Sequence, residues 1–243
     1  MVCKTRFLGL AFFMSLMAIA GPCPRVDEDL VRFDEAVSKM KEKFSQNPSD
    51  PQNPAWVNTY LAHMVEVDQY LRLAALNWPY EKGYSKEEKD CFWSELAPRW
   101  KTIDEGNTGN ITKLLTIYDW FRISKFGKEG DNNGWLLVQH ADQNPEFQKS
   151  ILVILEKLYP LGESSPANFA YLWDRVCASW QNPLFQKLQR YGTQGKCVGP
   201  GKWEPIPVED PEHVDERRKS MGLPPMSEYV EYFKEVCKSA NAS

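Results

Sequence analysis

The sequence predicts a mainly α-helical fold, a single helical domain with a small two-stranded β-hairpin near the C-terminus. Apolar residues recur at intervals of three and four along most of the 243-residue chain, which is the spacing of one helix face. Helix-start signals such as Asn-Pro and Ser-x-x-Glu precede several of these runs. Extended segments rich in turn residues are confined to 189–194 and 203–208, with glycines between them.

The first twenty residues have the composition of a secretory signal. Lys4 and Arg6 form a basic start, an apolar run follows from Phe7 to Ala20, and Ala18-Ile19-Ala20 fits the small-x-small cleavage pattern. This run is shorter than the ~18 apolar residues of a membrane-spanning helix. We therefore expect a secreted or periplasmic protein whose mature chain begins near Gly21.

The predicted domain organisation has three parts. Residues 1–20 form the signal peptide, residues 21–53 an N-terminal helix with a linker, and residues 54–239 the helical domain. The linker 45–53 is rich in Ser, Asn and Pro, which is typical of a loop.

Within the domain, local patterns predict where helices begin and end. We expect helices to begin at Asp27, Pro54, Ser85, Ile111, Pro145, Pro166, Pro211 and Ser227. Trp78-Pro79 is expected to end the second of them, because proline disrupts helix interiors. The glycine-containing segments 106–109 and 125–133 are expected to be loops, and the last helix is expected to end at Ser239.

The charge balance excludes several classes of partner. The chain has 29 basic and 33 acidic residues, and loss of the leader changes the net charge from −4 to −6. Without a basic patch, binding to nucleic acid or to anionic membrane surfaces is not expected. No later segment is apolar and long enough to span a bilayer. The expected partner is a polar small molecule or a protein.

Cysteine usage fits an oxidising compartment. Cys3 leaves with the leader, and five cysteines remain, namely Cys23, Cys91, Cys177, Cys197 and Cys237. Since five is odd, at least one is free or pairs with another chain. Cys197 lies in the glycine-rich hairpin and is expected in a disulfide, with Cys177 as the candidate partner. Pro22 before Cys23 disfavours lipid attachment, and the scattered spacing indicates neither a metal site nor a cofactor.

A cluster of polar residues follows the apolar anchor formed by residues 135–138. Gln139, His140 and Asp142 come directly after it, and Gln148 lies in the next helix, which Asn144-Pro145 begins. His140 and Asp142 are two positions apart and point in different directions, so they do not form a ready dyad. The cluster is either a set of helix caps around a core histidine or part of a functional site.

Several blocks of the sequence resemble a widespread bacterial family, the domain of unknown function numbered 6624, over residues 54 to 235. The matching blocks are Met64 to Arg72, Trp135 to Asp142 with Phe147-Gln148, Ala170 to Arg175, Gln189 to Gln194, Pro207 to Pro211, Arg217-Arg218 and Gly222 to Pro225. Asp119-Trp120-Phe121 stands where the family usually carries Gly-Trp-Pro, so this loop differs. The family has no settled activity, and the resemblance therefore implies no mechanism.

The polar residues of these blocks are the candidate site. His140, Asp142 and Gln139 are the candidate catalytic residues, and the candidate binding residues are Asp68, Gln69, Arg72, Gln148, Asp174, Arg175, Gln189, Tyr191 and Gln194. We expect several elements of a helical domain to bring them to one pocket. Asp68 and Arg72 share a helix face and arrive together. Successive side chains of a strand point to opposite faces, so Tyr191 and Gln194 lie on different faces. Only one of the two is therefore expected to lie close to the helices.

Two functions from different classes remain open. The first is a hydrolase with His140 as general acid and base, oriented by Asp68, Asp142 or Asp174, with Arg72 or Arg175 for an anionic group. The second is a non-catalytic extracytoplasmic module that binds a ligand or a protein. A third hypothesis makes the polar blocks a structural network. The sequence contains neither a G-x-S-x-G nor a HExxH motif.

Overall fold

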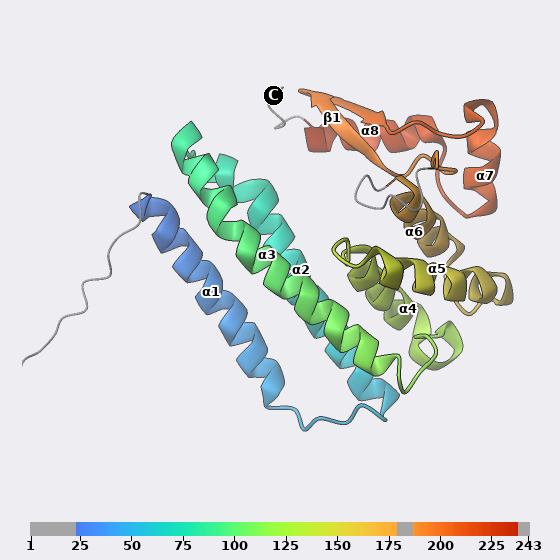
Figure 1. Ribbon diagram of the computed structural model, residues 1–243, viewed down its shortest axis with the longest axis horizontal. Helices are drawn as coiled ribbons and strands as arrows, with labels where there is room; N and C mark the ends of the chain where they lie inside the picture. Colours follow the sequence, from blue (N-terminus) through green and yellow to red (C-terminus); the bar gives the residue numbers. More distant parts are fainter. Residues whose placement is uncertain (1–22, 179–186, 238–243) are drawn as a thin grey trace, which may run out of the picture.

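The computed structural model describes residues 23–178 and 187–237, which form eight α-helices and one small antiparallel sheet (Figure 1). The predicted fold class is confirmed. The expected signal peptide at 1–20 and the cleavage site before Gly21 lie outside the described residues. In the described part of the chain, no helix is long and apolar enough to cross a membrane.

Three long helices lie side by side at the N-terminal end of the molecule, namely α1 (Pro24–Ser45), α2 (Pro54–Glu81) and α3 (Lys86–Leu114) (Figure 1). Their shared core contains Leu30 and Phe33 from α1, Leu71 from α2, and Phe92 and Leu96 from α3. A disulfide between Cys23 and Cys91 joins the start of α1 to α3. The expected N-terminal helix therefore packs against the helical domain.

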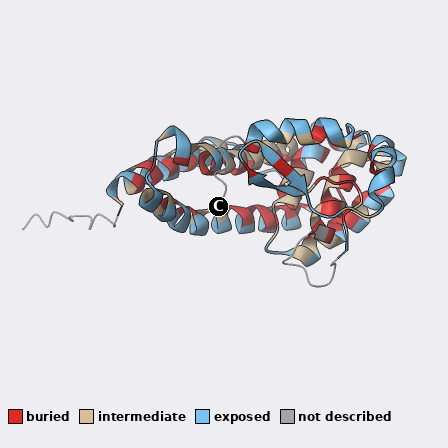
Figure 2. Cartoon of the chain, turned by 90° about the horizontal axis from the view of Figure 1, so that it is seen from above, coloured by how far each residue is buried: buried red, intermediate tan, exposed pale blue. Residues whose placement is uncertain are grey.

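A second core lies where the other halves of α2 and α3 meet three more helices. These are α4 (Ile123–Gln139), α5 (Pro145–Leu158) and α6 (Pro166–Ala178), with the 3₁₀ turn η1 (Tyr159–Leu161) between the last two. Its central residues include Leu61, Ile111, Phe121 and Leu155, all fully buried. Figure 2 shows buried positions in red on the sides that the helices turn toward one another. α2 and α3 contribute to both cores and so connect the two halves.

The C-terminal region packs on α6 and contains the sheet. Strands β1 (Gly195–Gly199) and β2 (Lys202–Pro205) pair antiparallel, followed by η2 (Pro211–His213), α7 (Val214–Ser220) and α8 (Met226–Val236). Trp203 of β2 stacks on Phe233 of α8 with 4.9 Å between ring centroids. The expected helix end at Ser239 lies outside the described residues.

The predicted helix starts at Pro54, Ser85 and Pro145 are confirmed. The Asn53 side chain accepts from the backbone N–H of Ala55 at 3.0 Å. Ser85 and Glu88 form a reciprocal capping box. Asn144 accepts from the N–H of Phe147 at 3.1 Å and so begins α5 before the polar cluster.

Three predicted helix boundaries are wrong. Trp78-Pro79 does not end α2, which continues to Glu81 with Pro79 buried, because the Trp78 ring packs edge-on against Phe33 at 6.1 Å. The segment 106–109 belongs to the continuous helix α3. That helix ends at Leu114, so the expected helix from Ile111 to Phe121 is only its last turn followed by a loop.

The segment 125–133 is also helical, contrary to the prediction of a loop. Gly127 at φ 70° breaks the regular helix within α4, and its lack of a side chain permits that conformation. Beyond the break, the Asp131 carboxylate accepts from Trp120 Nε1 at 2.7 Å and from Ser164 Oγ at 2.6 Å. Trp120 and Ser164 lie outside this segment, and their hydrogen bonds stabilise a helix where the composition of 125–133 indicates a loop.

The hairpin and one disulfide partner differ from the prediction. The strands begin after the expected segment 189–194, and the second strand is Lys202–Pro205 rather than 203–208. Cys197 forms a disulfide as predicted, but its partner is Cys237 and not Cys177. Cys177 is a free, buried thiol within α6, whereas α8 crosses the sheet and brings Cys237 beside β1.

Candidate functional site

His140 is held by a buried carboxylate from another helix. It lies at the C-terminal end of α4, and its Nδ1 is 2.9 Å from Oδ2 and 3.1 Å from Oδ1 of Asp68, which is fully buried in α2. An ionised carboxylate can only accept hydrogen bonds, so Nδ1 carries the proton and donates. Nε2 of the neutral ring then presents its lone pair.

Asp68 has two further partners on its own helix. Gln69 Nε2 donates to Asp68 Oδ2 at 2.8 Å. Arg72 Nη1 is 2.8 Å from Asp68 Oδ1, which is an ion-pair distance, but its N–H is not aligned for a hydrogen bond. Arg72 Nη2 donates instead to Asp104 of α3 at 3.1 Å. One arginine therefore lies between two buried carboxylates, and His140 contacts one of them.

The surroundings of Arg72 keep this group in place. Its guanidinium lies over the Trp100 ring, 5.0 Å from the ring centroid. Burial raises the pKa of Asp104 above its usual value, and Arg72 offsets that rise only in part. Asp104 and Trp100 are one helical turn apart on α3, and neither was among the predicted site residues, because no local pattern links α3 to Arg72.

His140 is accessible on its other side. Its side chain is 12% exposed whereas Asp68 is fully buried. Within the described residues, no protein group makes a hydrogen bond to His140 Nε2. A water molecule or a polar ligand can therefore reach this nitrogen without displacing a protein partner.

Asp142 does not contact His140 but pairs with Arg175 of α6. Arg175 Nε donates to Asp142 Oδ1 at 2.8 Å, and Nη2 donates to Oδ2, so the pair is bidentate. Gln148 Nε2 donates to Asp142 Oδ1 at 3.2 Å and to the carbonyl of Gln139 at 3.1 Å. Burial raises the pKa of Asp142, but Arg175, Gln148 and His140 together lower it more, so the net pKa is below the usual value.

A cavity of about 370 Å³ lies beside this pair, between the end of α4, α6, the sheet and α8. Its polar lining comes from Gln139, Arg175, Thr193 and Gln194, and its aromatic lining includes Tyr171, Trp203 and Tyr229. Arg175 Nη1 donates to Gln194 Oε1 at 3.4 Å. Gln139 Oε1 is buried without a hydrogen-bond partner in the protein. Such an unpaired acceptor favours a ligand or water that donates to it.

Three of the predicted binding residues instead hold segment 189–194 in shape. Asp174 is fully buried and accepts from the backbone N–H groups of Arg190, Tyr191 and Thr193 at 2.7, 3.1 and 2.9 Å. Gln189 bridges the backbone N–H and carbonyl of Gln194, both at 2.9 Å. Tyr191 packs beside Ala170 and Leu223. These groups support the loop from which Gln194 reaches the cavity.

The structure therefore divides the predicted site into three neighbouring groups. His140 lies with Asp68, Gln69 and Arg72, whereas Gln139 and Gln194 line the cavity with Arg175, which Asp142 and Gln148 hold. Asp174, Gln189 and Tyr191 form the support. His140 itself does not line the cavity. No group of three or more His, Cys, Asp or Glu side chains among the described residues is arranged to hold a metal ion.

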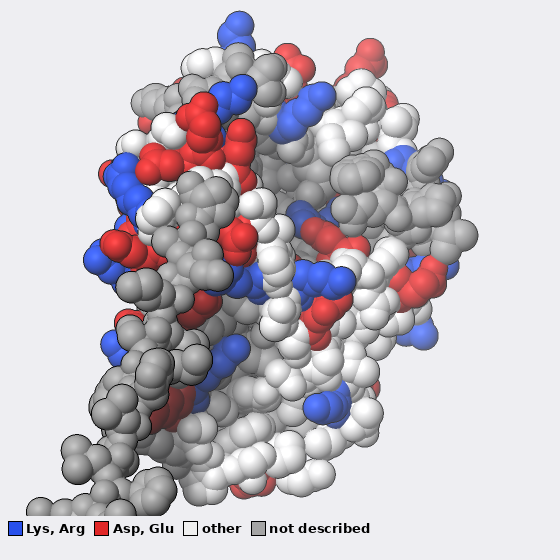
Figure 3. Space-filling view, turned by 60° about the vertical axis from the view of Figure 1, so that its left-hand side comes forward, with Lys and Arg blue, Asp and Glu red and all other residues white. Residues whose placement is uncertain are grey.

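Surface charge adds little to the site. Figure 3 shows basic and acidic side chains interspersed over the face that it presents. Such mixing does not attract a polyanion to that face.

The comparison with protein families gives one match. A family model described as a family of unknown function, DUF6624, matches residues 57–238. No curated protein and no solved structure matches the chain. The match agrees with the resemblance found from the sequence blocks and includes every residue of the three groups.

Proposed function

The chain belongs to the DUF6624 family, and we propose that it is an exported hydrolase in which His140 acts as general acid and base. One observation carries this proposal. A fully buried carboxylate, Asp68, holds His140 through Nδ1 and leaves Nε2 accessible. Imidazole is the side chain best suited to proton transfer near neutral pH, and the carboxylate of Asp68 fixes its orientation here.

The proposed chemistry is activation of water. His140 Nε2 takes a proton from a water molecule as its oxygen attacks the substrate, and the imidazolium returns that proton to the leaving group. Asp68 stabilises the transient positive charge, since its carboxylate is buried and aligned with Nδ1. Arg72 and Gln69 keep the carboxylate oriented.

The adjacent cavity supports a polar, largely uncharged substrate. Amide side chains from Gln139 and Gln194 both donate and accept hydrogen bonds. Arg175 already has Asp142 as a bidentate partner, so it does not offer an uncompensated positive charge. Aromatic side chains provide an apolar wall, which is the usual composition of small-molecule sites.

Export is supported by the disulfides as well as by the leader. Cys23–Cys91 and Cys197–Cys237 are compatible with an extracellular or periplasmic protein. The pairing of Cys23 occupies the sulfur that a lipid would require. We therefore propose a secreted or periplasmic protein with a cleaved signal peptide and without a lipid anchor.

The test is a panel of ester, amide, glycoside and phosphoester substrates, applied to the purified mature chain. His140→Gln is expected to lower kcat/KM about 100-fold or more for the substrate that is turned over. His213→Gln is the matched control, because His213 Nδ1 also lies 2.9 Å from a carboxylate, that of Asp210, but is exposed. Equal activity of His140→Gln and the parent protein would contradict the proposal.

The second candidate is a binding module without turnover, which the buried, unpaired Oε1 of Gln139 favours. In that case a ligand found by thermal shift loses affinity in Gln139→Ala and Gln194→Ala and binds His140→Gln unchanged. Hydrolysis of that ligand by the parent protein, but not by His140→Gln, decides for the enzyme.

A further inference from the structure

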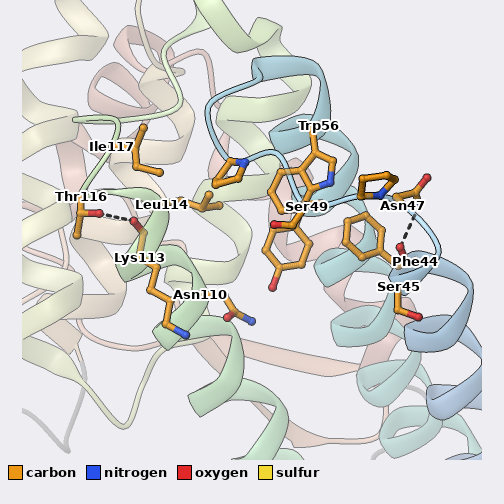
Figure 4. A pocket seen from close by; sticks show the side chains of 13 residues that line it. Phe44, Ser45, Asn47, Ser49, Trp56, Asn110, Lys113, Leu114, Thr116 and Ile117 are labelled. Atoms are coloured by element: carbon orange, nitrogen blue, oxygen red, sulfur yellow. Dashed lines mark hydrogen bonds between the residues drawn. The ribbon is translucent and has the colours of Figure 1, made fainter.

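A second cavity of about 730 Å³ lies far along α2 from the His140 group, at the first turns of that helix. One wall comes from the end of α1, the loop after it and the start of α2, within residues 44–60. The other wall comes from residues 110–117 at the end of α3. Figure 4 shows these two sets of side chains facing each other across the pocket.

The first wall contains three aromatic residues, Phe44, Trp56 and Tyr60. The ring centroid of Tyr60 is 5.0 Å from that of Trp56 and 5.1 Å from that of Phe44. Phe44 also stacks on His63, with 4.6 Å between centroids and planes 5° apart. These mutual contacts hold the rings in place before any ligand arrives. A preformed aromatic wall favours a flat, apolar ligand body.

Eight of the thirteen lining residues of this pocket carry a polar side-chain group, and two of these groups carry the argument. The indole Nε1 of Trp56 is buried and has no hydrogen-bond partner in the protein, and this group can only donate. Lys113 is the one charged residue in the lining that the structure records. None of the recorded ion pairs includes Lys113. The pocket therefore offers one buried N–H and one positive charge that forms no ion pair among the described residues, in a protein whose net charge is −4.

The pocket is separate from the His140 group and lies partly outside the family match. Phe44 and Trp56 precede residue 57, where the family match begins. None of the lining residues lines the cavity beside Arg175. The N-terminal helix and its loop thus add a wall to the domain that the matched family region does not contain.

We propose that this pocket binds a small aromatic carboxylate. The aromatic body of the ligand packs against the rings of Trp56 and Tyr60 on one side and against the side chain of Leu114 on the other. The carboxylate pairs with Lys113 Nζ, and an oxygen of the ligand accepts from Trp56 Nε1. A volume of about 730 Å³ is within the usual range of sites for such compounds.

The test uses 2-naphthylacetate and its neutral amide as probes, with isothermal titration calorimetry on the full mature chain. The acid is expected to bind about tenfold more tightly than the amide, because only the acid forms a charge-assisted pair. Lys113→Gln removes that difference. Lys157→Gln is the matched control, since Lys157 also lies in the last turn of a helix but outside the pocket, and it leaves the difference intact.

Trp56→Phe separates this site from binding elsewhere. It keeps an aromatic ring but removes the donor, so both probes are expected to bind several-fold more weakly while circular dichroism and Tm report an intact fold. Three outcomes would overturn the proposal. They are the absence of binding at millimolar probe, equal affinity of acid and amide, and unchanged affinity in both Lys113→Gln and Trp56→Phe.

Discussion

Asp174 and Asp68 are both fully buried carboxylates, but different kinds of donors hold them. Asp174 accepts from three backbone N–H groups and from the Thr193 hydroxyl. Asp68 contacts only side chains, those of Gln69, Arg72 and His140. Backbone donors cannot leave without unfolding the segment to which they belong. Side-chain donors can turn toward a ligand and return.

This difference separates a structural carboxylate from a functional one. Arg72 and His140 are 17% and 12% exposed, so both can reach solvent when Asp68 changes. Two of the three backbone N–H groups that donate to Asp174, those of Tyr191 and Thr193, are buried. Removal of Asp174 is therefore expected to affect stability, and removal of Asp68 to affect chemistry.

The largest effect is expected for Asp174→Ala. It leaves buried backbone N–H groups unpaired, each at a cost of about 1–3 kcal/mol, so the free energy of unfolding should fall by about 3–5 kcal/mol in total. Urea denaturation followed by circular dichroism measures this loss. Thr193→Val, which removes only the hydroxyl, is the graded control. A loss below about 1 kcal/mol for Asp174→Ala would contradict the structural role of Asp174 and its contrast with Asp68.

Asp68→Asn is expected to cost less stability and more activity. The free energy of unfolding should fall by about 1–2 kcal/mol, since the partners of Asp68 can be hydrated. The kcat/KM of the reaction assigned to His140 should fall at least about 100-fold, because the asparagine amide no longer fixes the proton on Nδ1. Asp210→Asn beside His213 is the control. Nitrogen NMR of His140 reports the tautomer, and an unchanged tautomer would contradict this role.

Asp142→Asn is expected to have a smaller, pH-dependent effect. Arg175 keeps the folded-state pKa of Asp142 below its usual value of 3.8, despite burial, which acts in the opposite direction. The pair therefore stabilises the fold above that value, and its contribution is lost as the pH falls through the folded-state pKa. The side chain is 39% exposed, so solvent screening limits the effect to about 1 kcal/mol.

Urea titrations at neutral and at acidic pH check this prediction. The parent protein and Asp142→Asn should differ in stability at neutral pH and converge in acid. If the difference in stability between the two proteins grows on acidification, Arg175 does not stabilise the ionised form of Asp142 and the prediction is wrong.

The smallest expected effect is the reactivity of Cys177, one helical turn after Asp174. Burial, with a smaller contribution from Asp174, raises the pKa of this thiol to about 11. Ellman's reagent at mildly alkaline pH should therefore not label it in the folded parent protein. Asp174→Ala should accelerate labelling because the fold opens more often, whereas Asp68→Asn should not. Equal acceleration in both variants would show that the two carboxylates support the fold alike.

Local signals were sufficient for much of the fold. The helix starts at Pro54, Ser85 and Pro145 were predicted correctly because a helix start depends on residues within three or four positions. Apolar periodicity predicted the mainly helical class for the same reason, since a helix face repeats over neighbouring turns. The blocks shared with the family also lie in short, continuous stretches.

Local signals failed where contacts between residues far apart in the sequence determine the secondary structure. Pro79 and the glycines in 106–109 indicate breaks, yet both segments are helical. In 125–133 the helix is interrupted at Gly127 but continues beyond it. At Gly134 an added Cβ would lie 2.3 Å from the Phe121 ring, so this glycine serves close packing rather than a turn. The lost helix propensity of about 1 kcal/mol for a glycine is outweighed by burial of the long helices against two cores.

The sequence by itself determined the helical class, the family, the leader pattern and the polar residues worth examining. The tertiary structure alone decided how those residues pair. His140 and Asp68 are 72 positions apart, and three candidate carboxylates were available from the sequence. Which one meets His140 depends on how α2 packs against the end of α4. That packing is set by apolar burial all along both helices, which no local pattern around His140 encodes.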